Sequence, residues 1–248
     1  MYLQNEEALL LARDMRESRV NLNVLGLGKR SPYIGREEMI RTAMVSLFCA
    51  YKKSIVISGP AGCGKTSFVR ELAFRLNQFK PMLNGYVILE VNLGSVISDT
   101  GLRGEFERKI GTLIETVSPY ENVALFIDEG HSIANTRSDG GIGAMDLFKP
   151  FMLEQNLKLM IATTSAELAH IQGDAAFFRR FHHVRLGELS IDEKMNAIRL
   201  HIKYLEEYHG RKFCFDNFNF DNTSDLHDLL SHVDLQLARG RFENEFAI

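Results

Sequence analysis

Two polar patterns in the sequence consist of residue types that could bind and cleave a phosphoanhydride. The first is Gly59-Pro-Ala-Gly-Cys-Gly-Lys65-Thr66, which matches G-x-x-x-x-G-K-[ST] at every fixed position. An apolar run over 54–58 precedes it and an amphipathic run over 67–76 follows it, so we expect a strand, a loop and a helix. That order predicts a site for a nucleoside triphosphate.

Each part of the glycine loop has a role in this prediction. The three glycines let the backbone turn tightly and direct its N–H groups toward phosphate oxygens. Lys65 supplies a cation for the terminal phosphates, and Thr66 supplies a hydroxyl ligand for Mg²⁺. The predicted nucleotide contacts are Gly59, Pro60, Ala61, Gly62, Cys63, Gly64, Lys65, Thr66 and Ser67. The alternative is a glycine-rich turn that matches the pattern by chance.

The second pattern is the pair Asp128 and Glu129, which follows the apolar run 123–127. A continuously apolar run of this length is typical of a parallel strand that is covered on both faces. Downstream of a glycine loop, we expect Asp128 to join the Mg²⁺ ligands and Glu129 to activate a water for in-line attack on the γ-phosphate. The alternative is a pair of solvated acids at the end of a strand.

Strand-like and helix-like runs alternate through most of the chain. We expect strands at 54–58, 85–92, 123–127, 158–162 and 182–186, and helices at 4–17, 34–48, 65–76, 105–117 and 144–155. This alternation predicts an α/β fold with a five-stranded parallel sheet flanked by helices. After a capping box at Ser190 the pattern is helical only, with a second helix expected at 223–237.

These patterns suggest three regions. We expect an N-terminal helix and linker over 1–33, a large α/β domain over 34–188 and a small C-terminal helical lid over 189–248. In the lid, phenylalanines lie at 213, 215, 218 and 220. We interpret them as lid core, although a stacking platform for nucleic-acid bases is the alternative.

Composition limits the choice of partners and compartment. The net charge is -3, with 29 basic and 32 acidic residues, so the overall balance does not indicate nucleic acid or an anionic membrane. The three cysteines lack C-x-x-C pairing, which argues against a disulfide framework or zinc site and favours a cytoplasmic location. No apolar run approaches membrane-spanning length, and the N-terminus lacks the features of a signal peptide.

Taken in order, these patterns resemble the AAA+ superfamily, and within it the first ATPase module of the Clp-type unfoldases. The shared motifs are Ile34-Gly35-Arg36-Glu37, the glycine loop, Arg103-Gly104-Glu105-Phe106-Glu107, residues 126–131, residues 143–146, Lys149-Pro150, Ala162-Thr163-Thr164, residues 174–176 and Arg179-Arg180-Phe181. The resemblance implies a P-loop AAA+ fold, hydrolysis of ATP with Mg²⁺, and a ring of identical subunits, a hexamer, that acts on a protein client.

The resemblance also implies roles for residues outside the two patterns. Ile34 and Gly35 match family positions that contact the nucleotide, and Thr164 matches the sensor-1 position, where a hydroxyl holds the attacking water. Arg179 and Arg180 match the arginine fingers that reach the γ-phosphate of the neighbouring subunit. The alternatives are a β-branched pair at the end of a strand for Thr164 and a surface ion-pair site for the arginines.

The sequence departs from the family pattern at several positions. Leu102 stands where the pore loop of the family has an aromatic residue, and Gly130 stands where Asp-Glu-Leu-His has leucine. Arg239 and Arg241 are candidates for the sensor-2 arginine in a shortened closing motif. Family members usually join such a module to further domains, whereas we interpret this chain as a short stand-alone ATPase. A leucine in the pore loop predicts a weaker grip on a client than an aromatic ring would provide.

Three functions are compatible with these observations. The first is an ATPase that assembles into a ring and remodels a protein partner. The second is an ATP-dependent switch or scaffold subunit of a larger machine. The third is a helper ATPase in DNA replication or transposition, although the basic stripe or helix-turn-helix expected of one is not visible in the sequence.

Overall fold

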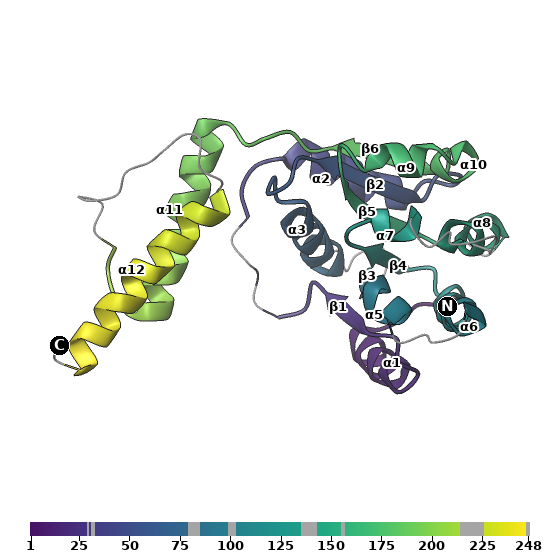
Figure 1. Ribbon diagram of the computed structural model, residues 1–248, viewed down its shortest axis with the longest axis horizontal. Coiled ribbons are helices and arrows are strands. Elements are labelled where there is room, and N and C mark those ends of the chain that lie inside the picture. Colours follow the sequence, from purple (N-terminus) through teal and green to yellow (C-terminus); the bar gives the residue numbers. More distant parts are fainter. Residues whose placement is uncertain are drawn as a thin grey trace. The chain divides into compact units, whose positions relative to one another are not determined.

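The chain forms two compact units in the computed structural model, whose helices and strands are labelled in Figure 1. The larger unit contains residues 1–30 and 37–186, and the smaller contains 31–36 and 187–248. The structure describes residues 1–28, 30, 33–78, 85–98, 103–134, 143–154, 157–213 and 226–246. The predictions for Leu102 and for the phenylalanines at 215, 218 and 220 therefore lie outside the described residues.

The larger unit contains one six-stranded sheet in the order β1-β3-β4-β5-β2-β6. Its strands are β1 (Leu22–Leu25), β2 (Ser54–Gly59), β3 (Val87–Val91), β4 (Val123–Ile127), β5 (Leu159–Thr164) and β6 (Phe181–Arg185). Strands β2 to β6 are parallel, which confirms the predicted five-stranded parallel arrangement.

The sixth strand, β1, corrects the predicted strand number. It pairs antiparallel with β3, with Leu22 opposite Val91 and Leu25 opposite Ile88. The prediction missed it because four residues in a polar, glycine-containing stretch carry too little periodicity to indicate a strand. Leu22 is fully buried, so packing in the folded protein stabilises a strand that local sequence does not indicate.

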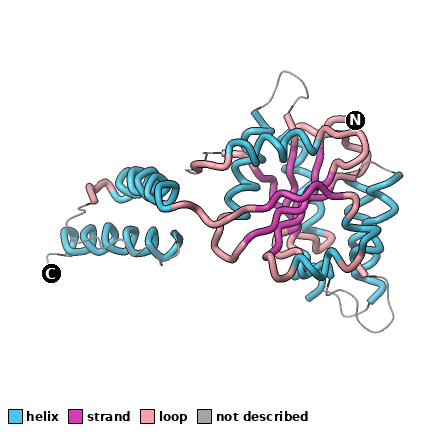
Figure 2. Tube along the Cα trace, turned by 90° about the horizontal axis from the view of Figure 1, so that it is seen from above, coloured by secondary structure: helices cyan, strands magenta, loops and turns pink. Residues whose placement is uncertain are grey.

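Helices lie on both sides of this sheet (Figure 2). They are α1 (Asn5–Glu17), α2 (Glu37–Leu47), α3 (Lys65–Gln78), α5 (Leu93–Ser98), α6 (Arg103–Val117), α7 (His131–Ala134), α8 (Ala144–Glu154), α9 (Leu168–Gln172) and α10 (Ala175–Phe178). Helix α3 covers one face, while α6 and α8 lie on the opposite side (Figure 1). Among the described residues, no helix is both long and apolar enough to span a bilayer.

The apolar patterns explain this layering. Strands β2 and β4 are buried at every position because helices cover both of their faces. Residues Ile110, Leu113, Ile114 and Val117 recur at helical spacing on α6 and join Leu125 and Ile127 of β4 in one core cluster. The strand order places the carboxyl ends of β4, β5 and β2 side by side, which is where open α/β sheets bind ligands.

The smaller unit contains α11 (Ile191–His209) and α12 (Leu226–Phe246). The two helices share an apolar core of Ile198, Ile202, Phe213, Leu229, Val233 and Leu237. The predicted capping box is present, because the Ser190 side chain accepts from the Glu193 N–H and Glu193 reaches back to Ser190. Phe213 is part of this core, as the lid-core interpretation predicted, and α12 continues beyond its predicted end at residue 237.

Candidate functional site

The glycine loop joins β2 to α3 and contains two left-handed glycines. Gly62 has a φ of 71° and Gly64 a φ of 87°, a region that side chains disfavour. At Gly59, an added Cβ would lie 2.5 Å from the Leu186 carbonyl oxygen and 2.6 Å from Cys63 Sγ. The predicted glycines are therefore needed for both the turn and its close packing. Within the loop, Cys63 is buried, whereas Ala61 and Gly62 are exposed.

The first turn of α3 carries Lys65, the predicted phosphate-binding residue, and Thr66, a predicted Mg²⁺ ligand. Lys65 Nζ donates to the carbonyl oxygens of Gly59 at 3.1 Å and Pro60 at 2.8 Å, so its ammonium is held inside the loop. Thr66 Oγ1 donates to Asp128 Oδ2 at 2.6 Å. The structure thus brings together the two predicted Mg²⁺ ligands from α3 and from the end of β4. Ser67, the next residue, is exposed.

The turn after β4 has an unusual backbone. Asp128 Oδ1 accepts from the Glu129 N–H at 3.0 Å, and Glu129 has a φ of 55°. A non-glycine residue in this region costs roughly 1–3 kcal/mol, and such residues cluster at functional sites. Gly130 then donates its N–H to the Ala162 carbonyl oxygen at 2.7 Å. An added Cβ at Gly130 would lie 2.3 Å from Ile161 Cγ2, so this departure from the family pattern has a packing reason.

The end of β5 carries Thr164, which lies opposite Gly59 in the β2–β5 ladder. Thr164 Oγ1 accepts from the Glu167 N–H at 3.2 Å, and Glu167 Oε2 accepts from the Thr164 N–H at 3.1 Å. Hydrogen bonding with Thr164 lowers the pKa of the Glu167 carboxyl, and His131 adds to this effect. Sequence reasoning missed Glu167, although Thr164-Ser-Ala-Glu167 has the spacing of a capping box.

The two predicted arginine fingers follow α10. The position of this helix is set by Asp174 at its N-terminus, whose carboxylate accepts from Lys149 Nζ at 2.5 Å, while Asp146 accepts from the same ammonium at 2.7 Å. Arg179 is exposed, and Arg180 donates to a backbone carbonyl of α10. Within the described part of the chain, neither arginine makes a hydrogen bond or ion pair with the glycine loop or the Asp128 turn.

The remaining predicted residues belong to the smaller unit. Ile34 and Gly35 lie in its segment 31–36, where Gly35 has a φ of 81° and Arg36 donates to the Gly187 carbonyl oxygen at 2.7 Å. Arg239 lies on α12 and is exposed. The Arg241 side chain lies outside the described residues, so no contact distinguishes the two sensor-2 candidates.

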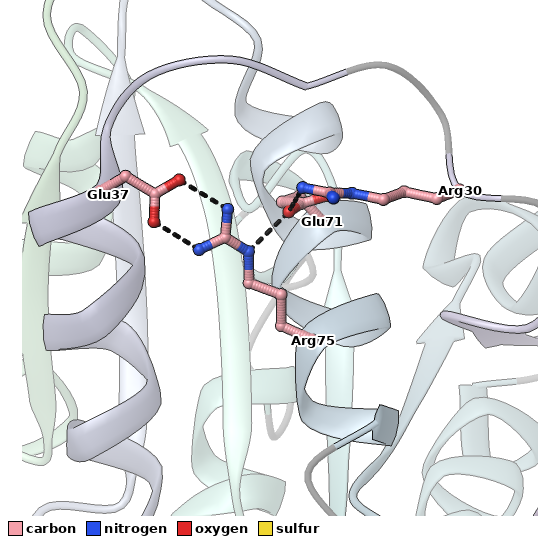
Figure 3. Close-up of polar contacts among 4 residues, drawn as sticks. All are labelled: Arg30, Glu37, Glu71 and Arg75. Carbon is pink, nitrogen blue, oxygen red and sulfur yellow. Dashed lines mark hydrogen bonds and ion pairs between the residues drawn. The ribbon is translucent and has the colours of Figure 1, made fainter.

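A network of charged side chains joins α3 to Arg30 and Glu37 (Figure 3). The Glu71 carboxylate, which is buried, accepts from both Arg30 and Arg75, and Arg75 also donates to Glu37 at 2.5 and 2.6 Å. Hydrogen bonding with Arg75 lowers the pKa of Glu37. This network ties the helix that carries Lys65 to the start of α2. The Glu71–Arg75 spacing indicated only a local helix pair, and sequence reasoning missed the network.

Comparisons with known proteins show which family the chain belongs to. Residues 55–188 match the family described as "ATPase family associated with various cellular activities (AAA)". The ATP-dependent Clp protease ATP-binding subunit ClpE of Streptococcus pneumoniae is 33% identical over 195 residues, which cover 76% of this chain and 26% of that protein. The chaperone protein ClpB of Meiothermus ruber is 35% identical over 187 residues, which cover 74% and 22%.

A solved structure is also similar. The closed-state cryo-EM reconstruction of Hsp104 with ATPγS and FITC casein superposes with a TM-score of 0.73 at 25% identity. The match covers 89% of this chain and 40% of that chain. The chain spans about a quarter of the length of the two curated relatives, ClpE and ClpB.

Proposed function

Because the chain belongs to the ATPase family associated with various cellular activities, we propose that it binds and hydrolyses ATP with Mg²⁺ at the carboxyl edge of its sheet. The family match covers 134 of its 248 residues. The observation that carries the proposal is the 2.6 Å contact between Thr66 Oγ1 and Asp128 Oδ2. A hydroxyl and a carboxylate are hard oxygen ligands, so this donor pair fits Mg²⁺.

The other loop residues fit a triphosphate. Lys65 donates only to loop carbonyl oxygens in the described structure, so its ammonium can exchange these acceptors for phosphate oxygens. We assign phosphate binding to residues 59–67 and nucleotide contacts to Ile34 and Gly35. When bound, Mg²⁺ neutralises charge on the β- and γ-phosphate oxygens. We further assign residues 34–188 as the ATPase domain and 189–248 as its helical lid, with the boundary segments 34–36 and 187–188 grouped with the lid in the smaller unit.

We assign Glu129 as the base that accepts a proton from the attacking water. The water oxygen then forms a bond to the γ-phosphorus while the bond to the bridging oxygen breaks, and that electron pair leaves with ADP. Thr164 Oγ1 already accepts from the Glu167 N–H, so its own O–H proton is available to hold the water.

We also propose that six copies form a ring in the cytoplasm and that ATP turnover remodels a protein partner. Arg179 and Arg180 would then act at the site of the neighbouring subunit. Two observations support this. Arg179 is exposed, and among the described contacts neither arginine bonds to its own glycine loop. A similar protein, Hsp104, has been solved with ATPγS and casein. Asp174 caps α10 by accepting from the Phe177 N–H, and this cap would hold both arginines in place.

Two substitutions test nucleotide binding and hydrolysis separately. Lys65→Ala should abolish binding of a fluorescent ATP analogue, because the loop loses its cation. Glu129→Gln should retain binding and hydrolyse ATP at least about a hundredfold more slowly, because the amide cannot accept the proton. Glu115→Gln, at an exposed position of α6, is the matched control. Equal loss of ATP affinity in the Lys65 and Glu129 variants would contradict the assignment of the base.

Mixed assemblies test the ring. Arg179→Ala or Arg180→Ala should retain ATP binding, and at least one should lose most of its turnover. Mixing that variant with Glu129→Gln subunits should restore part of the activity, because some interfaces then combine an intact arginine with an intact base. Mass measurement with ATP bound to Glu129→Gln gives the number of subunits. Specific activity that stays constant on dilution below any assembly threshold would refute action between subunits.

A further inference from the structure

The turn that carries Glu129 is joined to the end of β5 by two contacts. One is the backbone hydrogen bond from Gly130 to Ala162, at 2.7 Å. The other joins side chains: His131 Nδ1 lies 3.2 Å from Glu167 Oε1. This second contact is a close approach of nitrogen to oxygen rather than an aligned hydrogen bond, since among the described residues His131 Nδ1 is buried without a hydrogen-bond partner. It requires a proton on Nδ1, because only an N–H is attracted to a carboxylate oxygen.

Glu167 makes contacts in two directions. Its Oε1 faces His131 at the start of α7, while its Oε2 accepts from the Thr164 N–H at 3.1 Å and from Thr163 Oγ1 at 3.4 Å. Its own N–H donates to Thr164 Oγ1 at 3.2 Å. Glu167 therefore connects the residue two positions after Glu129 with the end of β5: its side chain contacts His131 and the Thr164 N–H, and its backbone N–H donates to the Thr164 hydroxyl.

From this geometry we infer that His131 and Glu167 are positioning residues for ATP hydrolysis, an inference that rests on the proposed function. Glu129 has a φ of 55°, and such a conformation persists only where its surroundings maintain it. Gly130 has no side chain with which to hold the turn. The His131–Glu167 contact supplies a side-chain attachment at the next residue, and the same carboxylate holds the Thr164 backbone by accepting from its N–H. Both residues act through Glu129 and Thr164, and not on the phosphate directly.

The kinetic test separates kcat from substrate binding. His131→Ala and Glu167→Ala should each lower kcat about tenfold, a smaller loss than the roughly hundredfold cost of misplacing a catalytic group by about 1 Å, because each removes only one of the contacts that hold the turn. KM and the Kd of a fluorescent ATP analogue should change less than about twofold. Glu167→Gln should fall between Glu167→Ala and the unmutated protein, since its amide oxygen can still accept from Thr164. His170→Ala, at an exposed position of α9, is the matched control.

The double variant tests whether the two residues act together. If the two residues act only through their shared contact, the double variant His131→Ala/Glu167→Ala should have about the same kcat as the slower single variant, because either change alone breaks the contact. Multiplication of the two single effects would refute coupling. An unchanged kcat in both single variants, in a protein that does hydrolyse ATP, would refute the inference while leaving the proposed function intact.

Hydrogen exchange without nucleotide tests the same inference independently of turnover. Amides of residues 129–134 should exchange about tenfold faster in Glu167→Ala and in His131→Ala, while those of α3 and β3 should exchange as before. A positioning role would be overturned if amides exchanged faster throughout the larger unit, or if the exchange rate rose at no residue. Failure of the unmutated protein to hydrolyse ATP would refute the proposed function instead, and the two failures are therefore distinguishable.

Discussion

The two edges of the sheet in the larger unit use polar residues in opposite ways. At the carboxyl edge, polar side chains contact one another, as Thr66 and Asp128 do, and the Glu129 backbone is strained. At the amino edge, where the strands begin, two polar side chains, Asn122 and Ser54, are buried and bond to backbone groups. Asn122, just before β4, is 1% exposed, and Ser54, the first residue of β2, is 2% exposed.

The amino edge ties distant backbone segments together. The Asn122 amide donates to the carbonyl oxygens of Leu3 and Gly85, and its oxygen accepts from the Leu3 N–H, all at 2.8 Å. The Ser54 hydroxyl accepts from the Leu159 N–H at 3.0 Å. Because buried polar groups that lose their partners cost about 1–3 kcal/mol each, this edge should determine stability. The strained and partly exposed carboxyl edge should instead determine turnover.

The largest expected effect is at Gly130 on the carboxyl edge. Gly130→Ala should lower kcat at least about a hundredfold, because its Cβ would lie 2.3 Å from Ile161 Cγ2 and force the Glu129 turn to move. Overpacking should also lower the free energy of unfolding by about 1–3 kcal/mol. Gly111→Ala on α6 is the control; among the described residues no neighbour outside the helix backbone lies within 4 Å of an added Cβ, so this change should stabilise the protein by about 0.5–1 kcal/mol. Normal turnover in Gly130→Ala would break the contrast between the edges.

At the amino edge we expect the reverse. Asn122→Ala should lower the free energy of unfolding by about 2–4 kcal/mol, because it removes the three bonds to Leu3 and Gly85. At a temperature where the variant is folded, kcat should stay within about twofold. Urea unfolding and ATPase assays measure the two quantities. Asn23→Ala, which removes an exposed bond to Glu90, should stay within about 0.5 kcal/mol. A large loss of turnover without loss of stability would contradict the prediction.

Lys158, which directly precedes β5 at the amino edge, should make the stability of the protein depend on pH. Burial, with a smaller effect of Lys53, lowers the pKa of Lys158 from its ordinary 10.5 to about 8. The unfolded chain therefore binds more protons between pH 8 and 10.5, so this residue makes the protein more stable as pH rises through that window, by at most about 3 kcal/mol. Lys158→Met should lack this dependence, and its stability relative to the unmutated protein should fall across the window. Lys52→Met, at an exposed position, should show a constant difference.

The site was predictable where short sequence patterns determine local geometry. Gly62 and Gly64 were expected to turn the loop, and both have positive φ values. Glu167 was not predicted, because a capping-box spacing indicates only a local turn and says nothing of His131. The Glu71 network was also missed, because Arg30 lies in a stretch we interpreted as linker and comes near α3 only when the chain folds.

By itself the sequence determined the five parallel strands, the longer helices beside them and the residue types at the end of β2 and β4, but not the short helices α5, α7, α9 and α10. These follow from apolar periodicity and turn chemistry, which act over a few residues. Only the tertiary structure decided that β1 joins the sheet beside β3 and that β5 lies between β4 and β2. It also decided that Thr66 contacts Asp128 and His131 contacts Glu167. Strand pairing and such side-chain contacts join residues distant in the chain, and their energies depend on packing that no local pattern encodes.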